Sequence, residues 1–432
     1  MHRLVVVLFR IAYRLMRARP ARCRVAFLSR QSARPSLDFR LLMARLNERD
    51  SKLDVAYSCW ADKGASRRAA LASSLRQLKL AAGAHVCVID GYVPAVSLPR
   101  LDPQTLVIQL WHAPGAVKRF GWQSVGTPAG RSRAQAHGLR MHANYSVVVA
   151  GGRGAQAPYA EAFCCDPSVI RPWGLPRMDY LLDDAFAPER QRVHERLAPQ
   201  VKRRDGQGAT VLYVPTFRAG PDGASRVAAW ADALAAALYD VGCQLLFTPH
   251  GLSASGPQAS AAPPGQPASA ASPAQQASAA PQALAASAAP QASATSAASA
   301  ASATSAATRY QQVHGAASLD LLGFADVVVT DYSAVAFEAG LLHKEVVFYV
   351  PDIEEYRVAP GLNIDPVREF PSIAFSDAQA VAYYLQEGRS ARRYESSGFW
   401  DFCDRYLERE PGSAIEHIVS SIERHLEACS LP

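Results

Sequence analysis

The segment from Asp320 to Val350 constrains the fold of this chain more than any other part of its 432-residue sequence. Val327-Val328-Val329 is a β-branched run, which is typical of a strand buried on both faces of a parallel sheet. Four polar-turn residues, 330–333, interrupt this apolar pattern. Helix-forming residues follow at 336–342, and a second buried strand is expected at 346–350. The segment therefore predicts a βαβ unit with polar residues at the carboxyl end of its first strand, where open α/β sheets bind ligands.

A helix that begins near Ser333 would present free backbone N–H groups and the positive end of its dipole. A phosphate group binds at such a position without needing a lysine. The same junction carries Thr330 and Asp331. We therefore expect these three residues to lie in a phosphate-binding site, although capping of the helix by Asp331 is an equally good interpretation.

Three other strands also end directly in polar residues. Strand 105–110 is followed by Trp111 and His112, strand 210–214 leads into Thr216 and Arg218, and strand 243–247 leads into His250. Any one of these junctions can be an ordinary turn or helix cap. Four junctions that deliver histidine, arginine and Asp/Ser to strand ends together predict one shared cleft.

Several segments resemble one known family, and their order and spacing agree along nearly the whole chain. They are QLWHAPGAVKRFGWQSVGT at 109–127, WGLPRMDYL at 173–181, YVPTFR at 213–218, ADVVVTDYSAVAFEAGLLHKEVVFYVPDIEEY at 325–356 and, more weakly, GLNID at 361–365. In these segments the chain is similar to the CDP-glycerol glycerophosphotransferases, which build teichoic acids and related cell-wall polymers. The resemblance implies an α/β fold of the GT-B type, in which two Rossmann-like domains face a central cleft.

The resemblance also implies an activity. A polyol phosphate would pass from CDP-glycerol or CDP-ribitol to a hydroxyl of a lipid-linked polyol-phosphate or glycan acceptor, and CMP would leave. Two alternatives stay open: a GT-B glycosyltransferase that uses a nucleotide sugar, and a catalytically silent, membrane-bound homologue. The second is kept open by Ala334, which stands where the family usually has a second serine, and by the altered context of His250.

His112 is the candidate general base. A histidine has an ordinary pKa near 6.5, so its neutral form can accept a proton at cytoplasmic pH. The resemblance places a family histidine here, although Ala113 replaces the usual glycine. A structural histidine bonded to a backbone carbonyl is the alternative. His250 matches the second family histidine and is expected to contact the donor phosphates, although it lacks the neighbouring basic residue and the following proline.

The remaining candidate residues are assigned to donor and acceptor. Thr216 and Arg218 would hold the diphosphate, because a guanidinium offers two parallel donors; an exposed surface arginine is the alternative for Arg218. Glu338 would bond ribose hydroxyls. Lys118 and Arg119 would meet the acceptor's phosphates unless they form a solvated basic face. No carboxylate cluster indicates a metal site, so no cofactor is expected to be required, although a diphosphate donor can carry Mg²⁺.

The amino-terminal segment suggests a membrane surface. Residues 1–37 hold nine arginines and no acidic residue, and Arg3, Arg10, Arg14 and Arg17 are separated by helical gaps of 7, 4 and 3. The apolar stretches are too short to span a bilayer. We expect a basic amphipathic helix attached to the cytoplasmic face of the membrane, with an ordinary packed helix or a signal peptide as alternatives.

Composition agrees with anionic partners and a two-domain chain. The net charge is +7, and no basic stripe interleaved with aromatics predicts nucleic-acid binding. Eight scattered cysteines without a C-x-x-C pair are typical of a reducing compartment. The expected organisation is a basic segment (1–20), a Rossmann-like acceptor domain (21–185), a crossover (186–209) and a Rossmann-like CDP-donor domain (210–428). An uncharged Ala/Ser/Pro-rich insertion at 253–308 is expected to be disordered.

Overall fold

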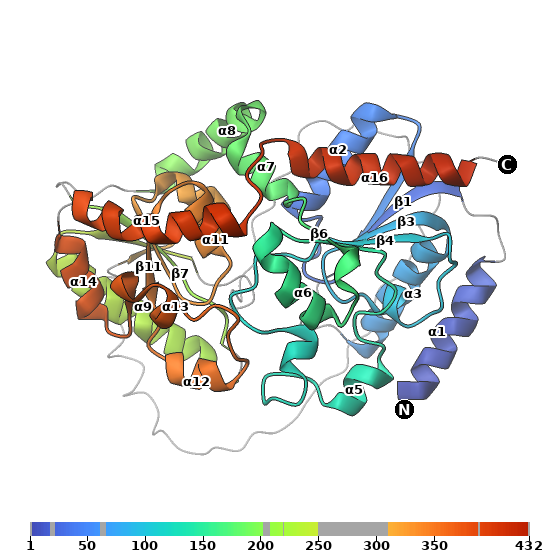
Figure 1. Ribbon diagram of the computed structural model, residues 1–432, viewed down its shortest axis with the longest axis horizontal. Helices are drawn as coiled ribbons and strands as arrows, with labels where there is room; N and C mark the ends of the chain where they lie inside the picture. The colour runs from blue at the N-terminus through green and yellow to red at the C-terminus, as the bar shows by residue number, and fades with distance from the viewer. Residues whose placement is uncertain are drawn as a thin grey trace, which may run out of the picture.

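The computed structural model describes residues 2–17, 22–60, 66–201, 208–218, 220–248, 310–387 and 389–430. These residues form two lobes, each built on a six-stranded parallel sheet (Figure 1). The predicted insertion 253–308 and the candidate His250 lie outside the described residues. Two parallel sheets with covering helices are the arrangement expected of paired Rossmann-like domains.

The first lobe contains a sheet of order β2-β1-β3-β4-β5-β6. Its inner strands, such as 84–89, 106–109 and 147–149, are rich in Val and Ile and are largely buried, as expected for a parallel sheet with helices on both faces. The strands are β1 Arg22–Ser29, β2 Asp54–Cys59, β3 Ala84–Ile89, β4 Leu106–Gln109, β5 Val147–Val149 and β6 Ile170–Arg171. The helices are α2 Leu37–Arg49, α3 Arg67–Ala82, α4 Pro94–Ser97, α5 Arg133–Gly138, α6 Gln156–Phe163 and α7 Pro176–Leu182.

The second lobe contains a sheet of order β12-β11-β10-β7-β8-β9. Strand β10 pairs with β11 on one side and β7 on the other, so the carboxyl ends of these three strands lie side by side. The strands are β7 Thr210–Val214, β8 Gln244–Phe247, β9 Tyr310–Gln311, β10 Val327–Thr330, β11 Glu345–Tyr349 and β12 Ala374–Phe375. The helices are α9 Gly223–Asp240, α10 Ser318–Leu321, α11 Val335–Leu341, α12 Ile353–Val358, α13 Pro366–Glu369, α14 Ala378–Gln386 and α15 Arg389–Tyr406.

Two helices connect the lobes. Helix α8 (Ala187–Leu197) follows α7 and contacts α10, so it bridges from the first lobe to the second. The last helix, α16 (Ser413–Ser430), returns to the first lobe and packs against α2 and α7 (Figure 1). Its amino terminus is fixed because the carboxylate of Asp179 accepts hydrogen bonds from the backbone N–H groups of Ala414 and Ile415. Thus α16 lies within the sequence range predicted for the donor domain but packs on the other lobe.

Helix α1 (His2–Arg17) packs against α3 and α5 of the first lobe. Val6 and Tyr13 are buried on the packed side, and Arg17 forms an ion pair of 2.7 Å with Asp102. The opposite side carries a row of exposed apolar residues, Leu4, Val7, Leu8, Ile11 and Leu15. None of the helices in the described ranges combines the length and the apolar character needed to cross a membrane.

Candidate active site between the two lobes

The loop after β4 carries His112 at the edge of the first sheet. Its shape is set by Trp111, which adopts a positive φ of 58° and donates its backbone N–H to the side chain of Gln109 at 2.8 Å. The indole ring stacks on Phe120 with centroids 4.6 Å apart. This ring also lies 4.1 Å from the imidazole of His112, so an aromatic surface supports one face of the histidine.

His112 is exposed, and its ring orientation is set by a backbone group. Nδ1 lies 3.2 Å from the carbonyl oxygen of Asp90, which follows β3. A carbonyl oxygen only accepts, so this hydrogen bond places the proton of the neutral imidazole on Nδ1. The lone pair is then on Nε2, which is the state that a general base requires. The predicted backbone-carbonyl bond is therefore present and is compatible with catalysis.

The loop that carries His112 also contacts the second lobe. Gly115 lies against α11 so closely that a Cβ atom there would be 2.4 Å from the ring of Phe337. Further along, Lys118 forms an antiparallel β-bridge with Leu362, and the backbone N–H of Arg119 donates to Gly361 at 2.9 Å. The segment 361–365, the weaker part of the family resemblance, is thus a contact between lobes.

The carboxyl ends of three adjacent strands in the second lobe hold a buried ionic cluster. Arg218 follows β7, Asp331 follows β10 and Asp352 follows β11. The guanidinium donates to both oxygens of Asp352, at 2.7 and 3.0 Å, and to Asp331 at 2.9 Å. It also donates to the carbonyl of Thr216 at 2.7 Å. The flanking rings of Tyr332 and Tyr356 complete its surroundings, with centroids 5.3 and 4.8 Å from the guanidinium carbon.

This geometry shows what Arg218 binds in the structure, while its predicted role at the donor stays a prediction. Its side chain is only 7% exposed, and its N–H groups are bound to two carboxylates and one carbonyl, so it does not present two free donors to a diphosphate. The surface-arginine alternative is wrong, because the residue is buried. Arg218 instead joins the ends of three strands, and buried ion pairs of this kind destabilise strongly when one partner is removed.

Two predicted donor-binding threonines are also occupied by structural hydrogen bonds. The hydroxyl of Thr330 donates to the carbonyl of Val214 at 2.7 Å, and Thr330 is fully buried. Thr216 donates its hydroxyl and its backbone N–H to Asp331, at 2.6 and 2.8 Å. Asp331 also accepts from the backbone N–H of Tyr332 at 2.6 Å. Direct donor contacts by these three side chains are therefore not supported.

Ser333 and Lys118 stay at the boundary between the lobes. Ser333 is half-buried just before α11, and its hydroxyl accepts from the backbone N–H of Val335 at 3.5 Å. Lys118 is also half-buried; burial lowers the pKa of its ammonium group, whereas the charge of Asp331 raises it. The charge of Arg218 lowers it further, and the net shift of the Lys118 pKa is downward. Arg119 is exposed.

Glu338 makes a contact that the sequence did not predict. Its carboxylate accepts from Arg177 Nη1 at 3.2 Å, and it is 5% exposed. A contact with ribose hydroxyls would have to disrupt this ion pair, so the prediction for Glu338 is not supported. Arg177 also binds Asp38 and the carbonyl of His112. Arg177 lies in the WGLPRMDYL motif, so the motif could have marked it as a candidate site residue. The motif alone does not reveal the partners of its side chain.

Asp90 is a second unpredicted group beside His112. Its side chain is 3% exposed, and its Oδ1 has no hydrogen-bond partner among the described residues. Burial raises the pKa of this carboxyl from 3.8 to about 7; the neighbouring charge of Asp38 adds to the rise, whereas Ser29 and Arg177 oppose it. The protonated form is thus stabilised below pH 7, close to the histidine whose ring its backbone orients.

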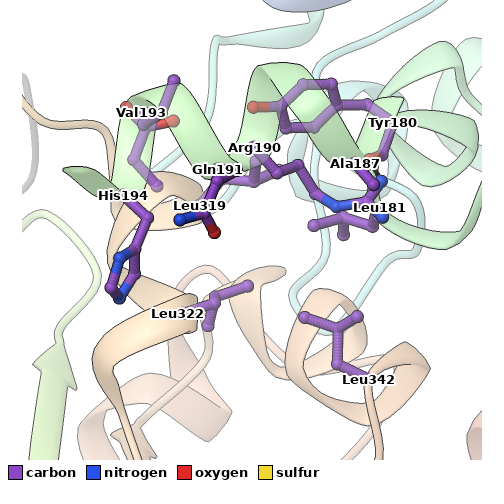
Figure 2. Close-up of a pocket in the computed structure, with 12 residues that line it drawn as sticks. Tyr180, Leu181, Ala187, Arg190, Gln191, Val193, His194, Leu319, Leu322 and Leu342 are labelled. Carbon is purple, nitrogen blue, oxygen red and sulfur yellow. Dashed lines mark hydrogen bonds between the residues drawn. The ribbon is translucent and has the colours of Figure 1, made fainter. Parts of the chain in front are cut away.

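A cavity of about 370 Å³ lies elsewhere, where α7 and α8 meet α10 and α11. Figure 2 shows His194 and Val193 on one side of it and Leu322 and Leu342 on the other. None of the predicted site residues within the described ranges lines it. Across the described ranges, no group of three or more His, Cys, Asp or Glu side chains is arranged to hold a metal ion. The prediction that no metal is required stays a prediction.

Comparison with known proteins identifies the relatives. The model of the CDP-glycerol:poly(glycerophosphate) glycerophosphotransferase family matches residues 11–262 and 298–424. A teichoic acid ribitol-phosphate primase of Bacillus spizizenii is 25% identical over 434 residues, covering 98% of this chain and 97% of that protein. A teichoic acid glycerol-phosphate primase of Bacillus subtilis is 21% identical over 340 residues, covering 78% and 73%.

Among solved structures, the wall teichoic acid polymerase TagF is similar in fold. The TM-score is 0.66 at 15% sequence identity, and the alignment covers 99% of this chain and 96% of that one. The predicted two-lobed α/β fold of the GT-B type is thereby confirmed, as is the family resemblance inferred from the motifs.

Proposed function

Since the chain belongs to the CDP-glycerol:poly(glycerophosphate) glycerophosphotransferase family, we propose that it transfers a polyol phosphate from a CDP-linked polyol to an acceptor hydroxyl group, with release of CMP. The observation that carries the proposal is the match of the family model along both lobes. The acceptor is either a growing chain of teichoic acid or a related polymer, or the molecule to which the first unit of such a chain is added. His112 supports the proposal, because it lies exposed on the loop where the two lobes meet.

His112 is the general base in this proposal. The acceptor hydroxyl gives its proton to Nε2, and its oxygen attacks the phosphorus that carries the polyol. A new P–O bond forms, the anhydride P–O bond breaks, and the leaving oxygen remains on CMP. The imidazolium that results is stabilised because Nδ1–H donates to the carbonyl of Asp90 at 3.2 Å. Such positioned proton transfer typically contributes about 10²–10⁴-fold in rate.

Donor binding is assigned to groups that are not hydrogen-bonded within the ionic cluster of Arg218, Asp331 and Asp352. The turn before α11 carries the half-buried Ser333 and keeps its proposed role at the donor phosphates, although in this structure the backbone N–H groups of Val335, Ala336 and Phe337 donate to Ser333 and Ala334. Lys118 lies where the first lobe contacts the second, and a cation there would suit a diphosphate as well as an acceptor phosphate. Arg119 keeps its proposed acceptor role, and His250 keeps its proposed role at the donor phosphates. Mg²⁺ carried by the diphosphate is compatible with this assignment.

CDP-glycerol is the donor proposed, and CDP-ribitol is the alternative. The family description names glycerophosphate, whereas the relative aligned over 98% of this chain is a ribitol-phosphate primase. Incubation with CDP-glycerol, CDP-ribitol or nucleotide sugars, followed by mass analysis of nucleotide and acceptor products, decides between them. Release of CMP with a polyol-phosphate mass added to the acceptor supports the proposal. Release of a nucleoside diphosphate would assign a glycosyltransferase, and saturable donor binding without turnover would assign a silent homologue.

Peripheral attachment to the cytoplasmic face of the membrane is proposed for α1. One side of the helix carries the exposed apolar row, and the positively charged Arg14 is exposed as well. The other side packs on the first lobe. This arrangement suits a helix lying in the plane of an anionic bilayer. A lipid-linked acceptor would then be available at the same surface.

Vesicle sedimentation tests the attachment. Leu8→Asp and Ile11→Asp place charge on the exposed row without altering the packed side, and each should reduce binding to vesicles of phosphatidylglycerol and phosphatidylcholine. Tyr383→Asp, at an exposed apolar residue of α14, is the matched control. Equal binding by all three variants and the unaltered protein would exclude α1 as the anchor.

A further inference from the structure

Arg177 connects three parts of the protein beneath the loop that carries His112. It is the second residue of α7, and its backbone N–H and side chain both bind Asp38 of α2. The backbone N–H donates to Asp38 Oδ1 at 2.8 Å, and Nε and Nη2 donate to Oδ2 at 2.9 and 2.5 Å. Two guanidinium nitrogens therefore share one oxygen of Asp38 while the backbone N–H of Arg177 binds the other oxygen, and these three bonds hold the guanidinium in one orientation within the first lobe.

The remaining nitrogen of this guanidinium has two other partners. Nη1 donates to the backbone carbonyl of His112 at 3.3 Å and to Oε1 of Glu338 at 3.2 Å. Glu338 belongs to α11 of the second lobe, so one nitrogen of Arg177 contacts the base-bearing loop and the opposite lobe at once. A shift of the second lobe would move Glu338, and through the shared nitrogen of Arg177 it would alter the hydrogen bond to the backbone carbonyl of His112.

The charges of this group do not balance. One guanidinium faces the carboxylates of Asp38 and Glu338, whose side chains are 2% and 7% exposed, while that of Arg177 is 18% exposed. Burial raises the pKa of Glu338, and Arg177 opposes that rise. Asp90 lies near enough to Asp38 and Arg177 for their charges to affect its carboxyl. A buried pair with excess negative charge does not improve stability by itself. Because Arg177 also donates to the carbonyl of His112, this charged group is connected to the proposed base and indicates a role in the reaction.

We propose that Arg177 is a positioning residue for His112 and that its ion pair with Glu338 couples the seating of the second lobe to the position of the base. This inference rests on the proposed function, because it assigns the way in which the transferase site is assembled. When the lobes are seated, Glu338 fixes Nη1, and Nη1 fixes the carbonyl of His112. A displacement of about 1 Å at a reacting group can lower a rate about 10²-fold, so a weak contact at this place has a large effect.

Glu338→Gln is the informative variant. The amide keeps the shape and one acceptor oxygen but removes one of the two buried carboxylates. We expect kcat to fall about 10- to 100-fold, with an unchanged KM for the CDP-linked donor. Thermal stability should stay the same or rise, because an excess negative charge has been removed. A residue with a merely structural role would lose stability and activity together.

The assay uses full-length protein, the CDP-linked polyol that turns over and a soluble polyol-phosphate acceptor analogue. Arg177→Lys should give a similar loss of kcat, because an ammonium group cannot hold Asp38, His112 and Glu338 in the same fork. The double variant should lose no more than Arg177→Lys alone, since that substitution already removes the contact with Glu338. Arg190→Lys is the matched control; Arg190 donates to the carbonyls of Tyr180 and Asp183, away from His112, and its variant should keep kcat.

Three results would overturn the inference. A normal kcat in Glu338→Gln would separate Glu338 from the base, and a raised donor KM at normal kcat would assign it to donor binding. A melting temperature that falls in step with kcat would make the contact structural. Failure of the unaltered protein to release CMP from either CDP-linked polyol would instead refute the proposed function, so the two failures are distinguishable.

Discussion

The buried carboxyl of Asp90 predicts how the free energy of unfolding changes with pH. Burial raises its folded-state pKa from 3.8 to about 7. Between about pH 4 and pH 7 the folded protein holds a proton that the unfolded chain has released, so this residue makes the protein less stable as pH rises through that window. Above pH 7 the loss is complete and constant. The folded-state and unfolded-state pKa values of Asp90 differ by about 3 units, which corresponds to a loss of about 4 kcal/mol in the free energy of unfolding as an upper limit.

Asp90→Asn removes this titration while keeping nearly the same shape. The free energy of unfolding is measured in urea at pH 5 and at pH 8. From pH 5 to pH 8 the unaltered protein should lose about 2–3 kcal/mol more of this free energy than the variant does. Asp401→Asn, at an exposed aspartate of α15, is the control and should leave the pH dependence unchanged. If Asp90→Asn and the unaltered protein lose the same stability between pH 5 and pH 8, the carboxyl titrates normally and the reasoning is refuted.

Other substitutions test the base, the ionic cluster and the insertion. His112→Ala should lower turnover by about 10²–10⁴-fold with little change in donor affinity, measured by steady-state rates and equilibrium binding of CDP-glycerol; near-normal turnover would remove His112 from the mechanism. Arg218→Ala should cost about 3–5 kcal/mol in urea unfolding, because it leaves Asp331 and Asp352 buried without their cation; a loss below about 1 kcal/mol would contradict the structural role. Replacing residues 253–308 by a short Gly-Ser linker should leave the melting temperature nearly unchanged, since the entropy of loop closure depends weakly on length; a large decrease would show that the segment is packed.

The sequence allowed the strand framework of the site to be predicted. The β-branched run at 327–329 became β10, and the strand expected at 210–214 became β7. These strands are neighbours in the sheet, so the polar residues that follow them meet at one edge. Local composition predicted this part, because burial on both faces of a parallel sheet requires continuous apolar runs, and their interruption by polar residues is visible in the chain.

The partners of the polar residues were not predictable in the same way. Arg218 and Asp352 are 134 residues apart, and Arg177 and Glu338 are 161 apart, so neither pair leaves a local pattern. An arginine after a strand has the same sequence appearance whether it binds a ligand or a buried carboxylate. The carboxylate partner of Arg218 was not predicted for this reason: it comes from the end of β11, which lies next to β10 and is separated from β7 by that strand.

The two lobes therefore contribute different kinds of groups to the junction. The second lobe uses Arg218, Asp331 and Asp352 to bind one another, which leaves one excess negative charge below the place where a diphosphate would approach. A diphosphate donor adds further negative charge, so cations or N–H donors have to come from elsewhere. In the proposed function, Lys118 would meet this need from the first lobe, on the same loop that carries His112. If this one loop supplies both the proposed base and the proposed cation, its contact with the segment 361–365 of the second lobe would bring the transfer site together and neutralise the donor in a single step.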